Sequence, residues 1–158
     1  MTVDLRARRT SVTRVIPAAP DQVFAVVSDA SLHPVIDGSS MVRGSTGKAE
    51  PLRLGSRFSM DMRLGLLPYR ITNEVVEFEQ DRLIAWCHPG RHRWRYELTP
   101  VEGPDGSPAT EVTETFDWST SLAPKVIELV GYPKRHEGNI ERTLERLATY
   151  VAKTTSAL

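Results

Sequence analysis

The feature that most constrains the fold is a strict alternation of apolar and polar residues in two central segments, 55–64 and 91–98. In an extended strand successive side chains point to opposite faces, so this period of two predicts strands with one buried face. The residues that share the buried face are Phe58, Met60, Met62 and Leu64 in the first segment and His92, Trp94, Tyr96 and Leu98 in the second. Both segments therefore belong to a sheet that covers a core on one side.

Further strands are predicted from runs of β-branched and aromatic residues at 10–16, 68–78, 83–87 and 110–118. Short loops separate the central strands, so neighbours must be antiparallel, because a parallel neighbour needs a crossover of about a dozen residues or more. The sequence His88-Pro89-Gly90-Arg91 predicts a type II turn with a positive φ at Gly90. The pair Val75-Val76 interrupts the alternation and indicates a β-bulge.

Helices are predicted at both ends of the chain. Two short ones follow the first strand, one beginning at Pro20 and one over 30–36. A long C-terminal helix carries an apolar stripe with helical spacing, formed by Ile140, Leu144, Leu147 and Val151. An earlier apolar segment, 126–130, precedes Pro133, which should kink or break the helix.

This order of elements, with helices segregated from the strands, is typical of an α+β fold. We expect a single domain over 1–158, in which an antiparallel sheet of about seven strands packs against the C-terminal helix. The helical stripe must be buried, and the apolar face of the sheet is its one large partner.

Composition excludes several classes of protein. Hydrophobic residues make up 40% and charged residues 25% of the chain, as in a globular protein. Twenty Lys and Arg balance twenty Asp and Glu, so the basic excess of a nucleic-acid-binding protein is missing. No apolar run approaches the ~18 residues that span a bilayer, the first residues lack a signal-peptide core, and Cys87 is the one cysteine. These features predict a cytoplasmic protein without stable membrane insertion.

Five stretches of the chain have a recognisable pattern: 16–24 (IPAAPDQVF), 27–29 (VSD), 74–78 (EVVEF), 83–86 (LIAW) and 110–117 (TEVTETFD). These stretches resemble the START-like (SRPBCC) superfamily, specifically its polyketide cyclase/dehydrase and lipid-transport group. The resemblance covers nearly the whole chain and implies a helix-grip fold, in which the bent sheet wraps around the long helix and encloses a cavity for an apolar ligand. Because the superfamily includes lipid carriers, hormone receptors, aromatases and chaperone activators, it identifies the fold better than the function. No catalytic motif of the polyketide enzymes is recognisable, so the resemblance assigns no catalytic residue.

The residues expected to face this cavity are inward aromatic and methionine side chains with a few polar groups. Plain core packing is the alternative for most of them, and for Asn73 the alternative is a solvated edge position, because Val75-Val76 breaks the alternation. A buried indole or phenol needs a hydrogen-bond partner, which a pocket supplies through water or ligand, and methionine suits a wall that adapts its shape. The predicted ligand-binding residues are Met60, Met62, Tyr69, Asn73, Trp86, Trp94, Tyr96, Glu114, Trp118 and Tyr132.

Glu114 is the most informative of these residues. Strict alternation places it with Val112, Phe116 and Trp118 on the buried face. A buried carboxylate must be paired, hydrated or protonated, and desolvation raises its pKa. Glu114 is therefore predicted to orient the polar end of a ligand or to act as a general acid or base. The alternatives are a pair with an arginine at the cavity mouth and a bulge that turns the side chain outward.

Cys87, His88 and His92 lie close together in the sequence, but their spacing does not support a metal site. Cys87 and His88 are adjacent on a strand and point to opposite faces, and their spacing to His92 fits no compact zinc site. We therefore expect neither a metal nor another cofactor. His92 is predicted to face inward and is the second candidate for an acid/base group, whereas His33 and His136 are expected at the surface or the cavity mouth.

Three functions are compatible with the sequence. The first is a binding protein or carrier for a small hydrophobic molecule such as a lipid or polyketide. The second is an enzyme of the cyclase, aromatase or dehydratase type that uses Glu114 or His92 to move protons. The third is a protein-interaction module with a filled cavity, which would use the exposed row Arg91, Arg93 and Arg95. The sequence is silent on the oligomeric state.

Overall fold

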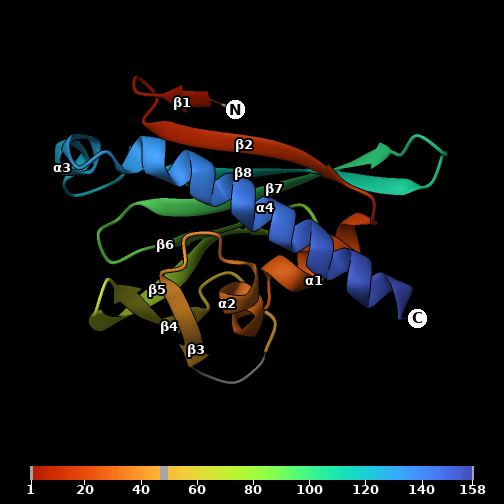
Figure 1. Cartoon of the computed structure of the whole chain (residues 1–158), viewed down its shortest axis with the longest axis horizontal. Coiled ribbons are helices and arrows are strands. Elements are labelled where there is room, and N and C mark those ends of the chain that lie inside the picture. The colour runs from red at the N-terminus through yellow and green to blue at the C-terminus, as the bar shows by residue number, and fades with distance from the viewer. Residues whose placement is uncertain (1, 47–49, 158) are drawn as a thin grey trace.

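A single sheet of eight antiparallel strands packs against one long C-terminal helix. The computed structural model describes residues 2–46 and 50–157. The strand order is β1-β2-β8-β7-β6-β5-β4-β3, and helix α4 runs across one face of this sheet with α1 and α2 beside it (Figure 1). The predicted α+β helix-grip architecture is confirmed, with eight strands in place of about seven.

The strands are β1 (Thr2–Asp4), β2 (Arg9–Ile16), β3 (Val42–Thr46), β4 (Arg57–Leu64), β5 (Leu67–Glu79), β6 (Leu83–Cys87), β7 (Arg93–Glu102) and β8 (Pro108–Asp117). The helices are α1 (Pro20–Val27), the 3-10 turn η1 (Ala30–Leu32), α2 (His33–Ile36), α3 (Pro124–Leu129) and α4 (Tyr132–Ser156). The two edge strands, β1 and β3, are short, and the sequence pattern does not predict them as separate strands. Among the described residues, no helix is both long and apolar enough to cross a bilayer.

Two local features of the sheet test the sequence pattern. The bulge predicted at Val75-Val76 is confirmed, because the register between β5 and β6 shifts between Val75 and Glu77. The turn at 88–91 also forms, with the Arg91 amide donating to the His88 carbonyl over 2.8 Å. However, the positive φ of 73° is at Arg91 and not at Gly90, so the type II prediction is wrong. The His88 imidazole accepts the Gly90 amide over 3.1 Å and holds the turn in this other geometry.

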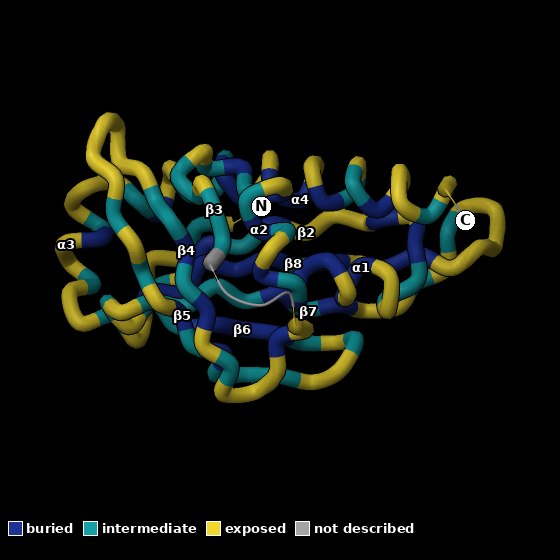
Figure 2. Tube along the Cα trace, turned by 90° about the horizontal axis from the view of Figure 1, so that it is seen from below, coloured by how far each residue is buried: buried dark blue, intermediate teal, exposed yellow. Residues whose placement is uncertain are grey.

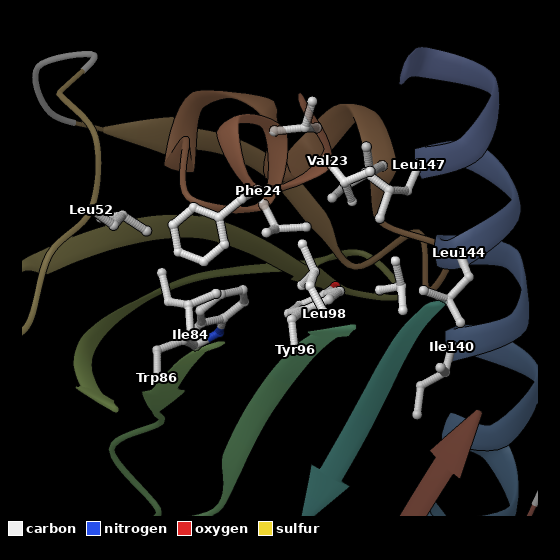
Figure 3. Close-up of a cluster of buried hydrophobic side chains, with 14 of the residues drawn as sticks. Val23, Phe24, Leu52, Ile84, Trp86, Tyr96, Leu98, Ile140, Leu144 and Leu147 are labelled. Atoms are coloured by element: carbon white, nitrogen blue, oxygen red, sulfur yellow. The ribbon is translucent and has the colours of Figure 1, made fainter. Parts of the chain in front are cut away.

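The apolar core fills the space between the sheet, α1 and α4. In Figure 3, Phe24 of α1, Ile84 and Leu98 of the sheet, and Leu144 and Leu147 of α4 point toward one another. The predicted stripe on α4 is confirmed, since its four members are at most 1% exposed. In Figure 2 the outward side of each α4 turn is exposed while the side toward the sheet is buried.

The break before the long helix also lies where the sequence places it. Helix α3 ends at Leu129 and α4 begins at Tyr132, with Pro133 in its first turn. Val130 and Gly131 lie between them, and Gly131 has a φ of 74°, which favours glycine. Tyr132, the first residue of α4, packs against the hydrophobic core.

The connection between α2 and β3 is fastened to α4 at Gly38. Its amide donates to the Thr143 hydroxyl over 2.9 Å, and its carbonyl accepts from Arg142 over 2.9 Å. A Cβ atom at this position would lie only 2.4 Å from the Asn139 carbonyl oxygen, so only glycine fits. This contact holds the neighbouring residues Asp37 and Ser39 beside the space between helix and sheet.

Candidate functional site

A cavity of about 270 Å³ lies between the sheet and the first turns of α4. Strands β4 to β8 form one wall, and α2, the α2–β3 connection and α4 form the other. The volume is near the lower end of the range for small-molecule pockets, about 300–1,000 Å³. The cavity therefore fits a compact molecule.

Most residues that the sequence predicts for the ligand site meet at this cavity. They are Met60, Met62, Tyr69, Asn73, Trp86, Trp94, Tyr96, Glu114 and Tyr132, together with His92. Trp118 is placed elsewhere, although it is fully buried as the alternation requires. It lies beyond the end of β8, where its indole N–H donates to the Glu128 carboxylate over 3.0 Å. It therefore supports the contact between β8 and α3 instead of the cavity wall.

Aromatic rings make up much of the wall. The Trp86 ring stacks on His33 at 4.7 Å between centroids and meets Phe58 and Tyr96 at 5.6 Å each. Trp94 lies 5.0 Å from Phe116 on the neighbouring strand. Edge and offset contacts of this kind fix the rings relative to one another. The wall is therefore preformed on the sheet.

Glu114 is buried in this wall, as predicted. It is 3% exposed and pairs in register with Tyr96 across β7 and β8, so neither a bulge nor an arginine pair accounts for it. Burial raises the pKa of Glu114 to about 8, a hydrogen bond with the Tyr96 hydroxyl lowers it, and the charge of Asp37 raises it. The carboxyl group is therefore mostly protonated at pH 7. Its Oε2 atom has no hydrogen-bond partner among the described residues.

Asn73 is a second buried polar group in the cavity wall. It is 4% exposed and pairs with Phe58 between β4 and β5. Its Oδ1 atom also has no partner in the described part of the chain. Buried polar atoms are paired in nearly all proteins, so an unpaired oxygen in a cavity wall indicates a contact with water or ligand.

All four histidines of the chain line the cavity, and the sequence identified only His92 in this role. The expectation that His33 is a surface or mouth residue is wrong. It is 7% exposed, and its Nε2 atom lies 2.9 Å from the Val27 carbonyl, which fixes the ring against Trp86. His136 is half-buried at the outer part of the wall, and His88 stacks on His92 at 4.2 Å.

The imidazoles are held neutral by their surroundings. Burial is the main cause that lowers the pKa of His92 to about 3 and that of His136 to about 4. Burial also lowers the pKa of His33 and His88. Among the described residues no lysine or arginine lines the cavity, and the carboxyl groups that line it are those of Glu114 and Asp37.

The outer part of the cavity is formed by half-exposed residues of β5 and α4. Tyr69 and Tyr132 both line the cavity, and burial, together with Tyr132, raises the pKa of Tyr69. The segments beside them carry exposed apolar side chains, namely Leu66, Leu67, Leu129 and Val130.

The described residues include no group of three or more His, Cys, Asp or Glu side chains arranged to hold a metal ion. The Cys87 thiol donates to the His88 carbonyl over 3.4 Å. The two histidines near it stack on each other and on the cavity side chains instead.

Comparison with known proteins agrees with this geometry. The sequence matches the family described as polyketide cyclase / dehydrase and lipid transport over residues 7–152. The chain belongs to this family. A member of similar sequence is an uncharacterized protein from Mycobacterium tuberculosis strain H37Rv, which is 38% identical over 156 residues, covering 96% of this chain and 67% of the relative.

Solved structures show the same fold at low sequence identity. A protein from Mycobacterium smegmatis superposes with a TM-score of 0.70 at 15% identity, covering 97% of this chain and 96% of its own. An AHSA1-like protein from Aeromonas hydrophila gives 0.65 at 18% identity, with 93% and 94% covered. These similarities show the helix-grip fold of the chain, and they leave its ligand open.

Proposed function

We propose that this protein binds a compact hydrophobic molecule in the cavity between the sheet and α4. The observation that carries the proposal is a space of about 270 Å³ walled by aromatic and methionine side chains within a family that includes lipid transport. Burial of apolar surface provides the affinity, at about 25 cal/mol per Å² before the entropic cost of binding is subtracted. The few polar groups of the wall orient the molecule.

The test is native mass spectrometry of the protein after mild purification, combined with calorimetric titration of naphthalene as a compact apolar probe. We expect a co-purified mass or naphthalene binding, or both. The variant Ile71→Trp fills the cavity from β5 and should abolish binding. Thr72→Trp is the matched control, because Thr72 is exposed on the other face of the same strand and should leave binding unchanged. Absence of both signals in the unmodified protein would contradict the proposal.

A second candidate is proton transfer on a bound ketone, and the properties of Glu114 favour it. A carboxyl group with a pKa of about 8 in a cavity wall is suited to donate or accept a proton near neutral pH. The side chain that forms a hydrogen bond with Glu114 is Tyr96 and not His92. The charged groups that act on the pKa of His92 are His88 and His136. With a pKa of about 3, His92 is a weak base.

This second candidate is tested by deuterium exchange into 2-tetralone, a compact enolisable ketone, followed by NMR in D₂O. A proton-transfer role predicts faster exchange with the protein than in buffer, and loss of that acceleration in Glu114→Gln. Equal rates with and without protein would exclude this chemistry for such ketones.

The interaction-module hypothesis has less support. It requires a space filled by side chains, whereas a cavity is present. The arginine row on the outer sheet face is also neutralised locally, because Arg93 and Arg95 lie within 3.7 Å of Glu77 and Arg95 within 2.7 Å of Glu97.

A further inference from the structure

The cavity wall contains two buried oxygen atoms that have no hydrogen-bond partner among the described residues, Asn73 Oδ1 and Glu114 Oε2. Their side chains are only 4% and 3% exposed, so bulk water does not solvate them freely. In the described part of the chain, the one other unpartnered buried side-chain atom is Arg93 Nε, which lies outside the cavity on the opposite face of β7 from Trp94. The two oxygens therefore indicate where the bound molecule must carry hydrogen-bonding groups.

The two oxygens belong to separate parts of the wall. Asn73 is on β5 and Glu114 on β8, and strands β6 and β7 lie between them. Neighbouring strands are about 4.8 Å apart, so we assign each oxygen its own polar group on the ligand. The ligand body between these groups faces Trp86, Trp94 and Phe116 and is therefore apolar.

The charge of the wall restricts the nature of these polar groups. Within the described chain no lysine or arginine lines the cavity, and its two carboxyl groups are those of Glu114 and Asp37. The lowered pKa values of His92 and His136 leave their imidazoles uncharged at pH 7. A carboxylate ligand would therefore lose its hydration without gaining a cation, which is strongly unfavourable.

A hydroxyl group can form a hydrogen bond with each of the two unpartnered oxygens, Asn73 Oδ1 and Glu114 Oε2. Asn73 Oδ1 is a carbonyl oxygen and needs a donor, so a ketone cannot serve it. Glu114 Oε2 accepts when the carboxyl is ionised and can donate when it is protonated, and a hydroxyl group matches either state.

We propose that the cavity selects an uncharged apolar molecule with two separated hydroxyl groups, one bonded to Asn73 Oδ1 and the other to Glu114 Oε2, and rejects carboxylates of the same size. This inference rests on the proposed binding function and specifies its ligand class.

The test is calorimetry at pH 7 with naphthalene, 2-naphthol, 2-naphthoate and the 1,5-, 2,6- and 2,7-dihydroxynaphthalenes. We expect at least one diol to bind about tenfold or more tightly than naphthalene, since a buried acceptor gains a partner. We expect 2-naphthoate to bind at least about tenfold more weakly than 2-naphthol. If naphthalene binds as tightly as every diol, or the carboxylate as tightly as 2-naphthol, the inference is overturned while the proposed function stands.

Two variants assign the selectivity to the named oxygens. Asn73→Leu and Glu114→Met remove an acceptor at nearly constant size, so each should reduce the advantage of the best diol over naphthalene while naphthalene itself still binds. Thr72→Val changes an exposed residue on the other face of β5 and should leave that advantage intact. An unchanged advantage in both acceptor variants would overturn the assignment, and the comparison within the unmodified protein does not depend on how well either variant folds.

Discussion

At the scale of single residues, the buried carboxyl group of Glu114 makes the stability of the protein depend on pH. In the unfolded chain its pKa is near 4.5, whereas in the folded protein it is about 8. Between these values the folded state holds a proton that the unfolded state has released. Stability must therefore fall as pH rises through this window.

We predict that Glu114→Gln removes this dependence. The unmodified protein should lose up to about 1.4 kcal/mol of unfolding free energy per pH unit between pH 4.5 and 8 relative to the variant. Urea denaturation of both proteins at pH 5, 6.5 and 8 measures the difference, and contributions from other groups cancel. Parallel stability curves would show that the Glu114 pKa is not raised.

Single residues also show where sequence reasoning ends. Side-chain direction on a strand depends on parity, so alternation predicts the buried face for Glu114 and for Asn73, and both are buried. It placed Trp118 on the buried face but could not tell that the cavity ends before it. His33 was missed because its burial depends on the Trp86 ring, which is distant in the sequence, and no local pattern signals that contact.

At the scale of elements, helix α4 contributes side chains both to the cavity wall and to the hydrophobic core. Its stripe residues Leu144 and Leu147 are fully buried against the sheet and α1, while Ile140 one turn earlier lines the cavity. The spacing of the stripe predicts this helix and its buried face. The attachment of the α2–β3 connection at Gly38 has no comparable signal, because glycine in a turn is common whatever it touches.

We predict that Leu144→Ala destabilises the protein by about 2–5 kcal/mol, since it leaves a void in a fully buried site. Glu145→Ala, at the exposed neighbouring position, should change stability by less than about 0.5 kcal/mol. Chemical denaturation measures both. Similar losses in the two variants would mean that the stripe is not the main contact of α4.

Gly38→Ala tests the attachment of the α2–β3 connection. The added methyl group would overlap backbone atoms of α4, at 2.4 Å from the Asn139 carbonyl oxygen and 2.6 Å from the Thr143 nitrogen. We expect a loss of about 1–3 kcal/mol in denaturation experiments. Gly44→Ala is the control, because its Cβ would meet only Asp61 at 3.5 Å or more, an ordinary contact. A neutral Gly38→Ala would show that the connection can move away from the helix.

At the scale of the whole molecule, the cavity places all four imidazoles of the chain in a poorly hydrated environment. Their pKa values are lowered from 6.5, so below pH 6.5 the unfolded chain takes up protons that the folded protein resists. Each such group therefore favours unfolding as the pH falls, which is opposite in sign to the effect of Glu114.

We predict that acid destabilises the Glu114→Gln variant progressively from pH 6.5 towards pH 4. Adding His92→Gln should reduce the slope by up to about 1.4 kcal/mol per pH unit, since the pKa of His92 is about 3 in the folded state. Denaturation curves at half-unit pH intervals provide the measurement. If the second substitution leaves the slope unchanged, His92 is better hydrated than its position in the wall implies.

The arrangement of the three tryptophans has a spectroscopic consequence. Trp86 and Trp94 line the cavity, whereas Trp118 is sealed between β8 and α3 with its N–H on Glu128. Indole emission shifts in wavelength with the polarity and mobility around the ring. Binding of a ligand should therefore change the fluorescence of Trp86 and Trp94 and leave that of Trp118 unchanged. The intrinsic fluorescence of the protein thus reports occupancy of the cavity without a label and includes an internal reference.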